Sequence, residues 1–244
     1  MKWIFLLVFF VSTSAWTQIN IQKIKSEATC GKYEKFEIQL QLDQQTHVQV
    51  NRFVFQNDTL GINPFNPKQI NVVAVFSAPS GKRVKRFAFY YQPYKENTLF
   101  DRWDKDTTAF PWRIRFAPDE IGTWKVEVFY QLNQGISSQK TTFQFECIPS
   151  RHKGYLTVDS TSNRYLSYSE SGKPFFSVSN NISSGGFYSY KPSQNNRHLK
   201  GVKQLIEVGG NFTRFDMQPQ AALPDWPLID NYKHKLDEMY AFDK

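Results

Sequence analysis

The sequence predicts a mainly β protein, an immunoglobulin-like antiparallel β-sandwich that is followed by an incomplete (β/α) barrel. Three observations support this prediction. Apolar and polar residues alternate in several short segments between residues 33 and 148, which is the period-two pattern of half-buried strands. Turn signals containing Pro, Gly and Asp separate these segments. Aromatic residues make up 16% of the 244-residue chain, a composition that favours strands.

The expected strands follow one another closely along the chain. The alternation begins at residues 36–41, and a nearly continuous apolar run occupies 72–76. A turn at 79–82 then leads into residues 84–91, so we expect a hairpin here. Further alternating runs lie at Trp112–Phe116, Trp124–Val128 and Phe143–Phe145. About seven short strands are typical of a two-sheet sandwich, and no helical period is recognisable in this stretch.

The pattern changes near residue 150. Short strands are expected at 155–158, 165–168 and 175–178, and a strand at 211–217. A helix that carries Leu199, Val202, Leu205 and Ile206 on one face separates the last two, and Gly209-Gly210 is placed to end it. A second helix is expected from Asp230, with a stripe formed by Tyr232, Leu236, Met239 and Tyr240.

Strand, helix, strand, helix is the opening of a parallel α/β unit. Residues 151–244 are far fewer than the roughly 250 of a complete (β/α)8 barrel, so we interpret the chain as a fragment or as the product of a truncated gene. The expected organisation is a signal peptide at 1–17, a β-sandwich at 18–150, and linker strands with the first βαβα units at 151–244.

The N-terminus has the three parts of an export signal. Lys2 supplies a positive charge, residues 3–11 are uniformly apolar, and small residues follow at 12–15. The apolar run is much shorter than the roughly 20 residues that cross a bilayer, and no later stretch approaches that length. We therefore expect a secreted or periplasmic protein that begins between Trp16 and Gln18 and has no membrane span. The alternative is a buried N-terminal strand.

The formal net charge of the chain is +8, but the basic residues are scattered. Their only dense patch contains Lys82, Arg83, Lys85 and Arg86. Nucleic-acid binding normally requires a clustered basic face, so we expect no nucleic-acid partner. Two interpretations of the positive charge remain: the partner is an acidic polysaccharide, or the charge has no functional meaning.

The two cysteines, Cys30 and Cys147, lie near the start and the end of the all-β region. In an oxidising compartment they could form a disulfide between the first and last strands, and the alternative is two buried free thiols. Two cysteines cannot complete a four-ligand zinc site. The four histidines are isolated in sequence and no nucleotide-binding or nucleophile motif is present, so we expect no metal or organic cofactor.

Two segments stand out as candidates for function. Residues 118–124 combine Pro, Asp, Gly and Trp between two expected strands, and we interpret them as a structural hairpin rather than a sugar-binding site. In residues 210–215, alternation places Phe212, Arg214 and Asp216 on one side of a strand. A charged Arg in a buried strand is costly unless it is paired, so Arg214 is either functional or reaches solvent at the strand end.

Several of these segments together resemble a known family. They are Tyr33–Glu37, Asn63–Pro67, Phe76–Gly81, Arg113–Pro118 and Gly122–Trp124. This combination resembles the domain of unknown function 5060, a β-sandwich that precedes barrels in bacterial glycoside hydrolases. The part from Gly154 through Tyr165-Leu166 and Gly172–Phe176 resembles that family's bridge into the barrel.

The resemblance implies a clan A glycoside hydrolase barrel. In such barrels an Arg at the end of the second strand supports the nucleophile, and Arg214 matches that position after Gly-Asn. Asn180 or Asn181 would lie at the end of the first strand on the catalytic face. The resemblance therefore implies Asn180, Asn181, Asn211 and Arg214 as substrate-binding residues.

The resemblance also implies two catalytic glutamates on the fourth and seventh barrel strands, which this chain does not include. Glu207 and Glu238 lie in expected helices and do not replace them. Retaining hydrolysis needs two carboxyl groups about 5 Å apart, so we name no catalytic residue.

The expected function is that of the N-terminal portion of a secreted, polysaccharide-degrading glycoside hydrolase, which is itself inactive and whose partner is a polysaccharide or oligosaccharide. The alternatives are a non-catalytic glycan-binding module and a structural or adhesive sandwich.

Overall fold

The computed structural model describes residues 19–56, 58–106, 108, 110–133, 135–180 and 201–213. The expected signal peptide, the second expected helix from Asp230, and the candidate residues Asn181 and Arg214 lie outside these residues. Those four expectations remain predictions.

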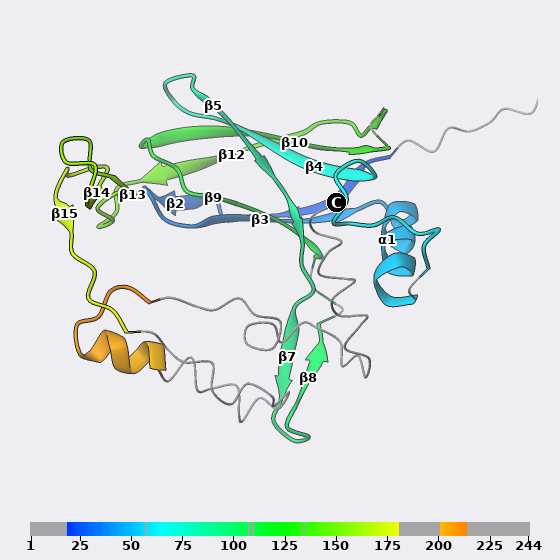
Figure 1. Ribbon diagram of the computed structural model, residues 1–244. Helices are drawn as coiled ribbons and strands as arrows, with labels where there is room; N and C mark the ends of the chain where they lie inside the picture. The colour runs from blue at the N-terminus through cyan, green and yellow to red at the C-terminus, as the bar shows by residue number, and fades with distance from the viewer. Residues whose placement is uncertain are drawn as a thin grey trace, which may run out of the picture.

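Two sheets face each other in the described chain (Figure 1). The first has the order β1-β3-β9-β6, with β1 at Ile21–Lys25, β3 at Phe36–Leu42, β9 at Trp112–Phe116 and β6 at Phe89–Tyr90. The second has the order β2-β12-β10-β4-β5, with β2 at Thr29–Gly31, β12 at Thr141–Ile148, β10 at Gly122–Leu132, β4 at Ile70–Ser77 and β5 at Arg83–Phe87. The short β11, Ile136–Ser137, pairs with β10. Strands β2 and β12 are parallel, and the other pairs in these two sheets are antiparallel.

Aromatic rings from both sheets form the core. Phe36 of β3 stacks on Phe145 of β12 with ring centroids 3.9 Å apart, and Phe76 of β4 stacks on Phe116 of β9 at 4.2 Å. Trp124 of β10 is fully buried between them. The alternating residues expected to point inward therefore do so, and the predicted two-sheet sandwich is confirmed.

A helix, α1 at Gln44–Gln56, corrects the expectation that the region 33–148 contains only strands. Asp43 caps its start, because the Asp43 carboxylate accepts hydrogen bonds from the Thr46 amide and hydroxyl, each at 3.0 Å. Thr46 and Val50 are buried one turn apart. The β-branched and aromatic residues of this segment conceal the helix in the sequence, since they have low helix propensity.

The expected strand at 84–91 is divided between the two sheets. Its first part, β5, pairs with β4 and so confirms the predicted hairpin. The chain then crosses at Ala88, whose amide donates to the Val72 carbonyl at 2.9 Å, and β6 pairs with β9 in the other sheet. The alternation of apolar and polar residues continues while the chain passes from one sheet to the other, so the sequence pattern does not reveal this change of sheet.

The segment Pro118–Trp124 is not a hairpin, which corrects a second expectation. Strand β9 before it belongs to the first sheet and β10 after it belongs to the second. The segment is therefore a connection between the layers, placed at one end of the sandwich.

Two smaller sheets lie beside the sandwich. Strands β7, Tyr94–Asn97, and β8, Arg102–Lys105, form a projecting hairpin (Figure 1). Strands β13, Leu156–Val158, β14, Leu166–Tyr168, and β15, Pro174–Phe175, form a three-stranded antiparallel sheet. Further along, residues 201–207 are helical and end at Gly209, whose φ is 82°, as the Gly-Gly pair predicts. Among the described residues, no helix is long and apolar enough to cross a membrane.

Candidate functional site at the open edge of the sandwich

A groove of about 570 Å³ lies between the edge strand β5 and the end of β9. Its lining includes four cationic side chains, one carboxylate and one exposed aromatic ring: Lys35, Lys82, Arg86, Arg115, Asp119 and Tyr155. The groove therefore combines an excess of positive charge with an aromatic ring, at the point where the two sheets separate.

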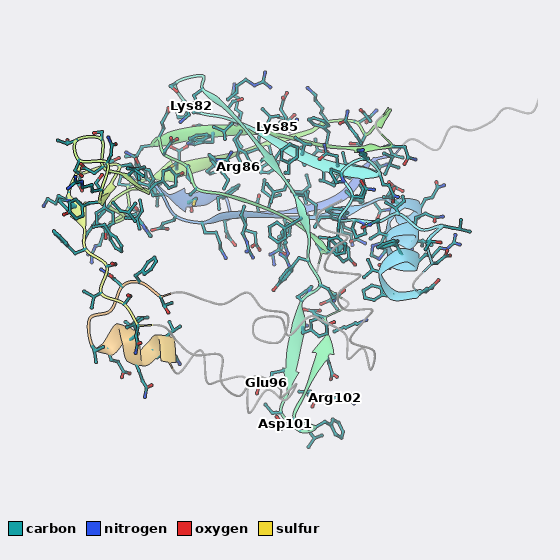
Figure 2. The ribbon with its side chains drawn as sticks, in the orientation of Figure 1. Lys82, Lys85, Arg86, Glu96, Asp101 and Arg102 are labelled. Carbon is teal, nitrogen blue, oxygen red and sulfur yellow. The ribbon has the colours of Figure 1, made fainter. Side chains whose placement is uncertain are left out.

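The period of two along β5 selects which basic residues enter the groove. Lys82 and Arg86 line it, together with Val84 between them. Arg83 instead pairs with Glu127 at 3.0 Å, and Lys85 lies 4.9 Å from the centre of the Phe87 ring. Figure 2 shows Lys82, Lys85 and Arg86 along this strand. The dense basic patch of the sequence is thus divided between two faces.

Two of the groove cations form no ion pair in the part of the chain that the structure describes. The Arg86 guanidinium donates to the Lys85 carbonyl at 3.0 Å and lies 5.7 Å from the centre of the Phe116 ring. Lys35 makes no ion pair with any described residue. Both side chains are exposed.

Arg115 is only partly neutralised. It donates to Glu37 Oε2 at 2.8 Å, while Arg113 donates to Glu37 Oε1 at 3.1 Å. One carboxylate therefore serves two guanidinium groups. Burial raises the pKa of Glu37, but the hydrogen bond from Arg115 and the charges of Arg113, Arg115 and Lys35 outweigh burial and lower the pKa overall.

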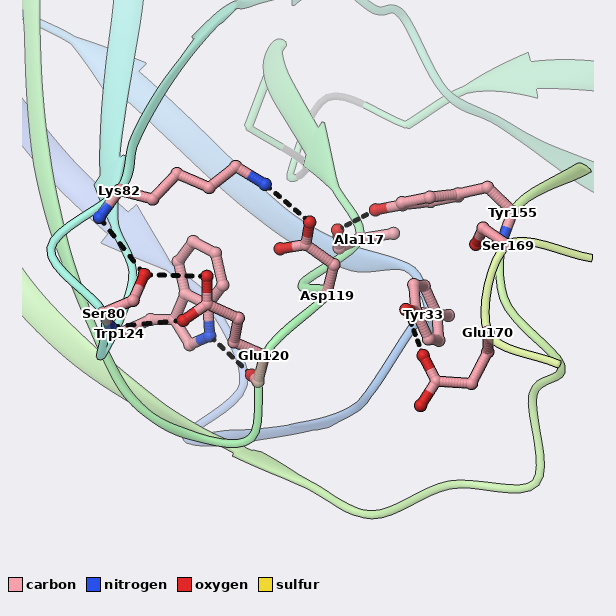
Figure 3. Close-up of polar contacts among 10 residues, drawn as sticks. All are labelled: Tyr33, Ser80, Lys82, Ala117, Asp119, Glu120, Trp124, Tyr155, Ser169 and Glu170. Carbon is pink, nitrogen blue, oxygen red and sulfur yellow. Dashed lines mark hydrogen bonds and ion pairs between the residues drawn. The ribbon is translucent and has the colours of Figure 1, made fainter. Parts of the chain in front are cut away.

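The connection between the sheets is fixed by polar contacts that Figure 3 shows. The buried Trp124 indole donates to the Glu120 carbonyl at 2.9 Å. The Glu120 carboxylate accepts from the Ser80 hydroxyl at 2.8 Å, and Asp119 pairs with Lys82 at 2.7 Å. One wall of the groove is therefore held in place by the turn between β4 and β5.

Tyr155 joins the three-stranded sheet to the sandwich. Its hydroxyl donates to the Ala117 carbonyl, and its ring packs edge-on against Tyr33 with centroids 5.0 Å apart (Figure 3). Burial and the neighbouring Asp119 charge raise the pKa of the Tyr155 hydroxyl, so it remains a donor at neutral pH. These two contacts hold the Tyr155 side chain, which also lines the groove.

Glu170 makes the second contact between these parts. It accepts from Lys32 Nζ at 2.7 Å and from the Tyr33 hydroxyl at 2.5 Å. Both hydrogen bonds lower the pKa of Glu170. Tyr33 has a φ of 64°, a left-handed conformation that a non-glycine residue rarely adopts, and its amide donates to the Pro118 carbonyl at 2.7 Å.

The structure brings together two of the four residues that the family resemblance implied for substrate binding. Ser179 and Phe212 form a parallel bridge. Asn211 holds this arrangement, because its side chain accepts from the Val178 amide at 2.8 Å and donates to the Phe176 carbonyl at 2.9 Å. The Asn180 carbonyl accepts from the Thr213 hydroxyl at 2.9 Å. Asn211 thus has a positioning role here, and substrate binding by these residues remains a prediction.

Cys30 and Cys147 are buried free thiols in the structure. They are direct partners in the parallel pairing of β2 and β12. Burial, followed by the proximity of Cys147, raises the pKa of Cys30 to about 11. The disulfide remains a prediction.

The sequence pointed to parts of this groove without assembling it. Residues 82–86 and 118–124 were both singled out, and the structure places Lys82 against Asp119. Tyr155 and Glu170 were not recognised, because they lie far along the chain from the residues they contact. Among the described residues, no group of three or more His, Cys, Asp or Glu could hold a metal ion.

A two-sheet sandwich with a basic groove at its open edge is therefore the structural class of this region. Residues 29–131 match the family model described as domain of unknown function (DUF5060). The match covers most of the segments on which the resemblance was based, and it confirms that resemblance. No curated protein sequence matches the chain.

Two solved structures are distantly similar to the chain. A crystal structure of a "putative glycoside hydrolase" from Bacteroides vulgatus is 18% identical with a TM-score of 0.45, and the similarity covers 77% of this chain but only 28% of that one. A solution NMR structure of a lipoprotein from Bacteroides thetaiotaomicron is 16% identical with a TM-score of 0.25, covering 55% of this chain and 81% of that one. Neither likeness carries an inference about function.

Proposed function

We propose that the chain is the N-terminal accessory portion of an exported glycoside hydrolase that degrades a polysaccharide, and that this portion is not itself catalytic. One observation carries the proposal. A sandwich that matches DUF5060 is followed, in the same chain, by the parallel bridge of Ser179 with Phe212. The helical residues 201–207 lie between those two strand positions in sequence.

Strand, helix and parallel strand form the unit from which (β/α)8 barrels are built. The family resemblance implies such a barrel after the sandwich, which supports the proposal. Asn211 supports this proposal, because its side-chain bonds to the backbone at 176 and 178 align the two strands. Tyr155 and Glu170 would then fix the direction in which the chain leaves the sandwich.

The coding sequence beyond Lys244 tests the proposal. We expect it to encode the rest of a barrel that carries one glutamate at the end of the fourth strand and another at the end of the seventh. Two such carboxyl groups would supply the acid and the nucleophile of retaining hydrolysis. A continuation without strand-end carboxylates, or with an unrelated fold, would contradict the proposal.

A further inference from the structure

We propose that the groove between β5 and β9 binds an anionic polysaccharide, with Lys35 and Arg86 contacting the acidic groups and Tyr155 contacting a sugar ring. This inference rests on the proposed function, because it takes the ligand to be a glycan. It goes further by assigning a site and a charge class.

The first argument is electrostatic. Four cations and one carboxylate line the groove, and that carboxylate, Asp119, is already paired with Lys82. Lys35 and Arg86 form no ion pair with a carboxylate among the described residues, although the charge of Lys35 contributes to lowering the pKa of Glu37. Clustered like charges repel one another, and an anionic ligand relieves this repulsion.

The second argument concerns the geometry of Arg86. The Arg86 guanidinium lies 5.7 Å from the centre of the Phe116 ring and donates to the Lys85 carbonyl, which leaves most of its donors without a protein acceptor. A planar guanidinium matches a carboxylate or a sulfate group through two parallel hydrogen bonds. The uronate carboxylate and the sulfate ester are therefore the two chemical groups to compare.

The third argument concerns Tyr155. Tyr155 is 41% exposed, yet its hydroxyl is bound to the Ala117 carbonyl and its ring packs against Tyr33 in a T-shaped arrangement. An aromatic ring with an apolar face and a polar tip suits a ligand that is itself amphipathic, as a sugar ring is. Because the ring is already fixed, little conformational entropy is lost on binding.

The size of the groove favours a glycan over a nucleic acid. A volume of about 570 Å³ lies within the range of small-ligand sites, so it suits a short stretch of a polysaccharide. A duplex would need an extended basic face, whereas Arg83 and Lys85 of the same strand point away from this groove and Arg83 is paired with Glu127.

The experiment measures binding of the full chain to matched pairs of polysaccharides by isothermal titration calorimetry. Polygalacturonate is compared with its methyl ester, and a sulfated galactan with its desulfated form. We expect binding to the charged member of at least one pair, weakened by added salt, and little binding to the neutral members. Selective binding of polygalacturonate would identify a carboxylate as the bound group, and selective binding of the sulfated galactan would identify a sulfate.

The variant K35Q/R86Q should bind the charged polysaccharide about tenfold more weakly, because two charge-assisted contacts are lost. The matched control is K68Q/K125Q, which removes the same charge at two exposed lysines outside the groove. Y155F keeps the ring but loses the hydrogen bond to the Ala117 carbonyl, so it should bind more weakly than the wild type and more tightly than Y155S, which lacks the ring. Circular dichroism and size-exclusion chromatography of each variant check its folding and its oligomeric state against the wild type.

Three results would overturn the inference: no binding to any charged polysaccharide, an equal loss in both double variants, or binding of single-stranded DNA as tight as that of the glycan. A fourth result would also overturn it: K35Q/R86Q binds the glycan normally but self-associates through the edge strand β5. The two cations would then serve only to prevent this strand from pairing with another chain. None of these results bears on the coding sequence beyond Lys244, so the proposed function is tested separately.

Discussion

Cys30 and Cys147 are direct register partners on the neighbouring parallel strands β2 and β12. Neighbouring strands lie about 4.8 Å apart, which is within the Cα separation that a disulfide spans. The raised pKa of Cys30 keeps the folded thiol protonated at neutral pH, so oxidation of the folded protein should be slow. Under the proposed export, a bridge is therefore expected to form while the chain folds in an oxidising compartment.

We expect the exported chain to contain this disulfide. Without reductant, neither cysteine should react with iodoacetamide after denaturation, and both should react once reduced. The oxidised chain should be more stable than the reduced chain by up to about 4–5 kcal/mol in urea unfolding. The unfolding free energy of the variant C30S/C147S should not change when reductant is added. Alkylation of both cysteines in unreduced exported protein would exclude the bridge.

The contact between Asp43 and Tyr130 predicts a dependence of stability on pH. Burial raises the pKa of Asp43, but hydrogen bonds from Tyr130 and Thr46 outweigh it and lower the pKa overall. The stability that Asp43 contributes is present above its unfolded pKa, about 3.9, and is lost as the pH falls through its folded value. Burial and the bond to Asp43 raise the pKa of Tyr130, so its contribution is lost as the pH rises above about 10.

The matched variants for this pair are D43N and Y130F. D43N retains an N-cap side chain and should flatten the fall in unfolding free energy below about pH 4. Y130F should flatten the fall above about pH 10. Acid and alkaline urea titrations measure both effects. Wild-type slopes in both variants would show that the pair does not titrate as proposed.

Trp124 should be a main determinant of sandwich stability. Its side chain is fully buried, its ring is stacked with that of Phe145, and its indole N–H donates to the Glu120 carbonyl. W124A should lose about 3–5 kcal/mol of unfolding free energy, as is usual for a large aromatic residue removed from a core. The control F100A truncates a side chain that is 63% exposed in the β7–β8 hairpin and should cost about 0.5 kcal/mol or less. Similar losses in both variants would contradict the packing described.

Glu170 should hold the three-stranded sheet against the sandwich. E170Q removes the negative charge that accepts from Lys32 and Tyr33, so backbone amides in β13 and β14 should exchange with deuterium several times faster. Amides in β10 should be unaffected, because that strand lies in the sandwich core. The control E96Q removes a charge in the β7–β8 hairpin and should leave β13 and β14 unchanged. Unchanged exchange in E170Q would contradict this role of Glu170 and would mean that Tyr155 alone holds the three-stranded sheet against the sandwich.

The sequence predicted the fold well where the period-two pattern is uninterrupted. Strands β3, β10 and β12 alternate between more and less buried residues, and β9 does so except at Arg113, which is buried; all four are expected from their apolar spacing. Helix α1 was missed, because its Val and Phe residues favour strands and its cap at Asp43 is a single residue. The crossing at Ala88 was missed because alternation does not reveal which sheet a strand joins.

The candidate site was only partly predictable. Residues 82–86 and 118–124 were noticed separately, yet nothing in the sequence shows that Lys82 reaches Asp119. Tyr155 and Glu170 are contributed by a segment that was expected only to lead into a barrel. Such contacts depend on tertiary packing between residues far apart in the chain, to which local periodicity is insensitive.

Hydrolysis of polysaccharides is the measurement that tests the central claim most directly. The 244-residue chain and the native polypeptide, isolated from its source with an antibody against the sandwich, should be assayed on one polysaccharide panel for release of reducing sugar. The account predicts release by the native polypeptide and none by the 244-residue chain. Hydrolysis by the 244-residue chain that a point mutation within it abolishes would contradict the account, as would a native polypeptide that hydrolyses nothing on the panel.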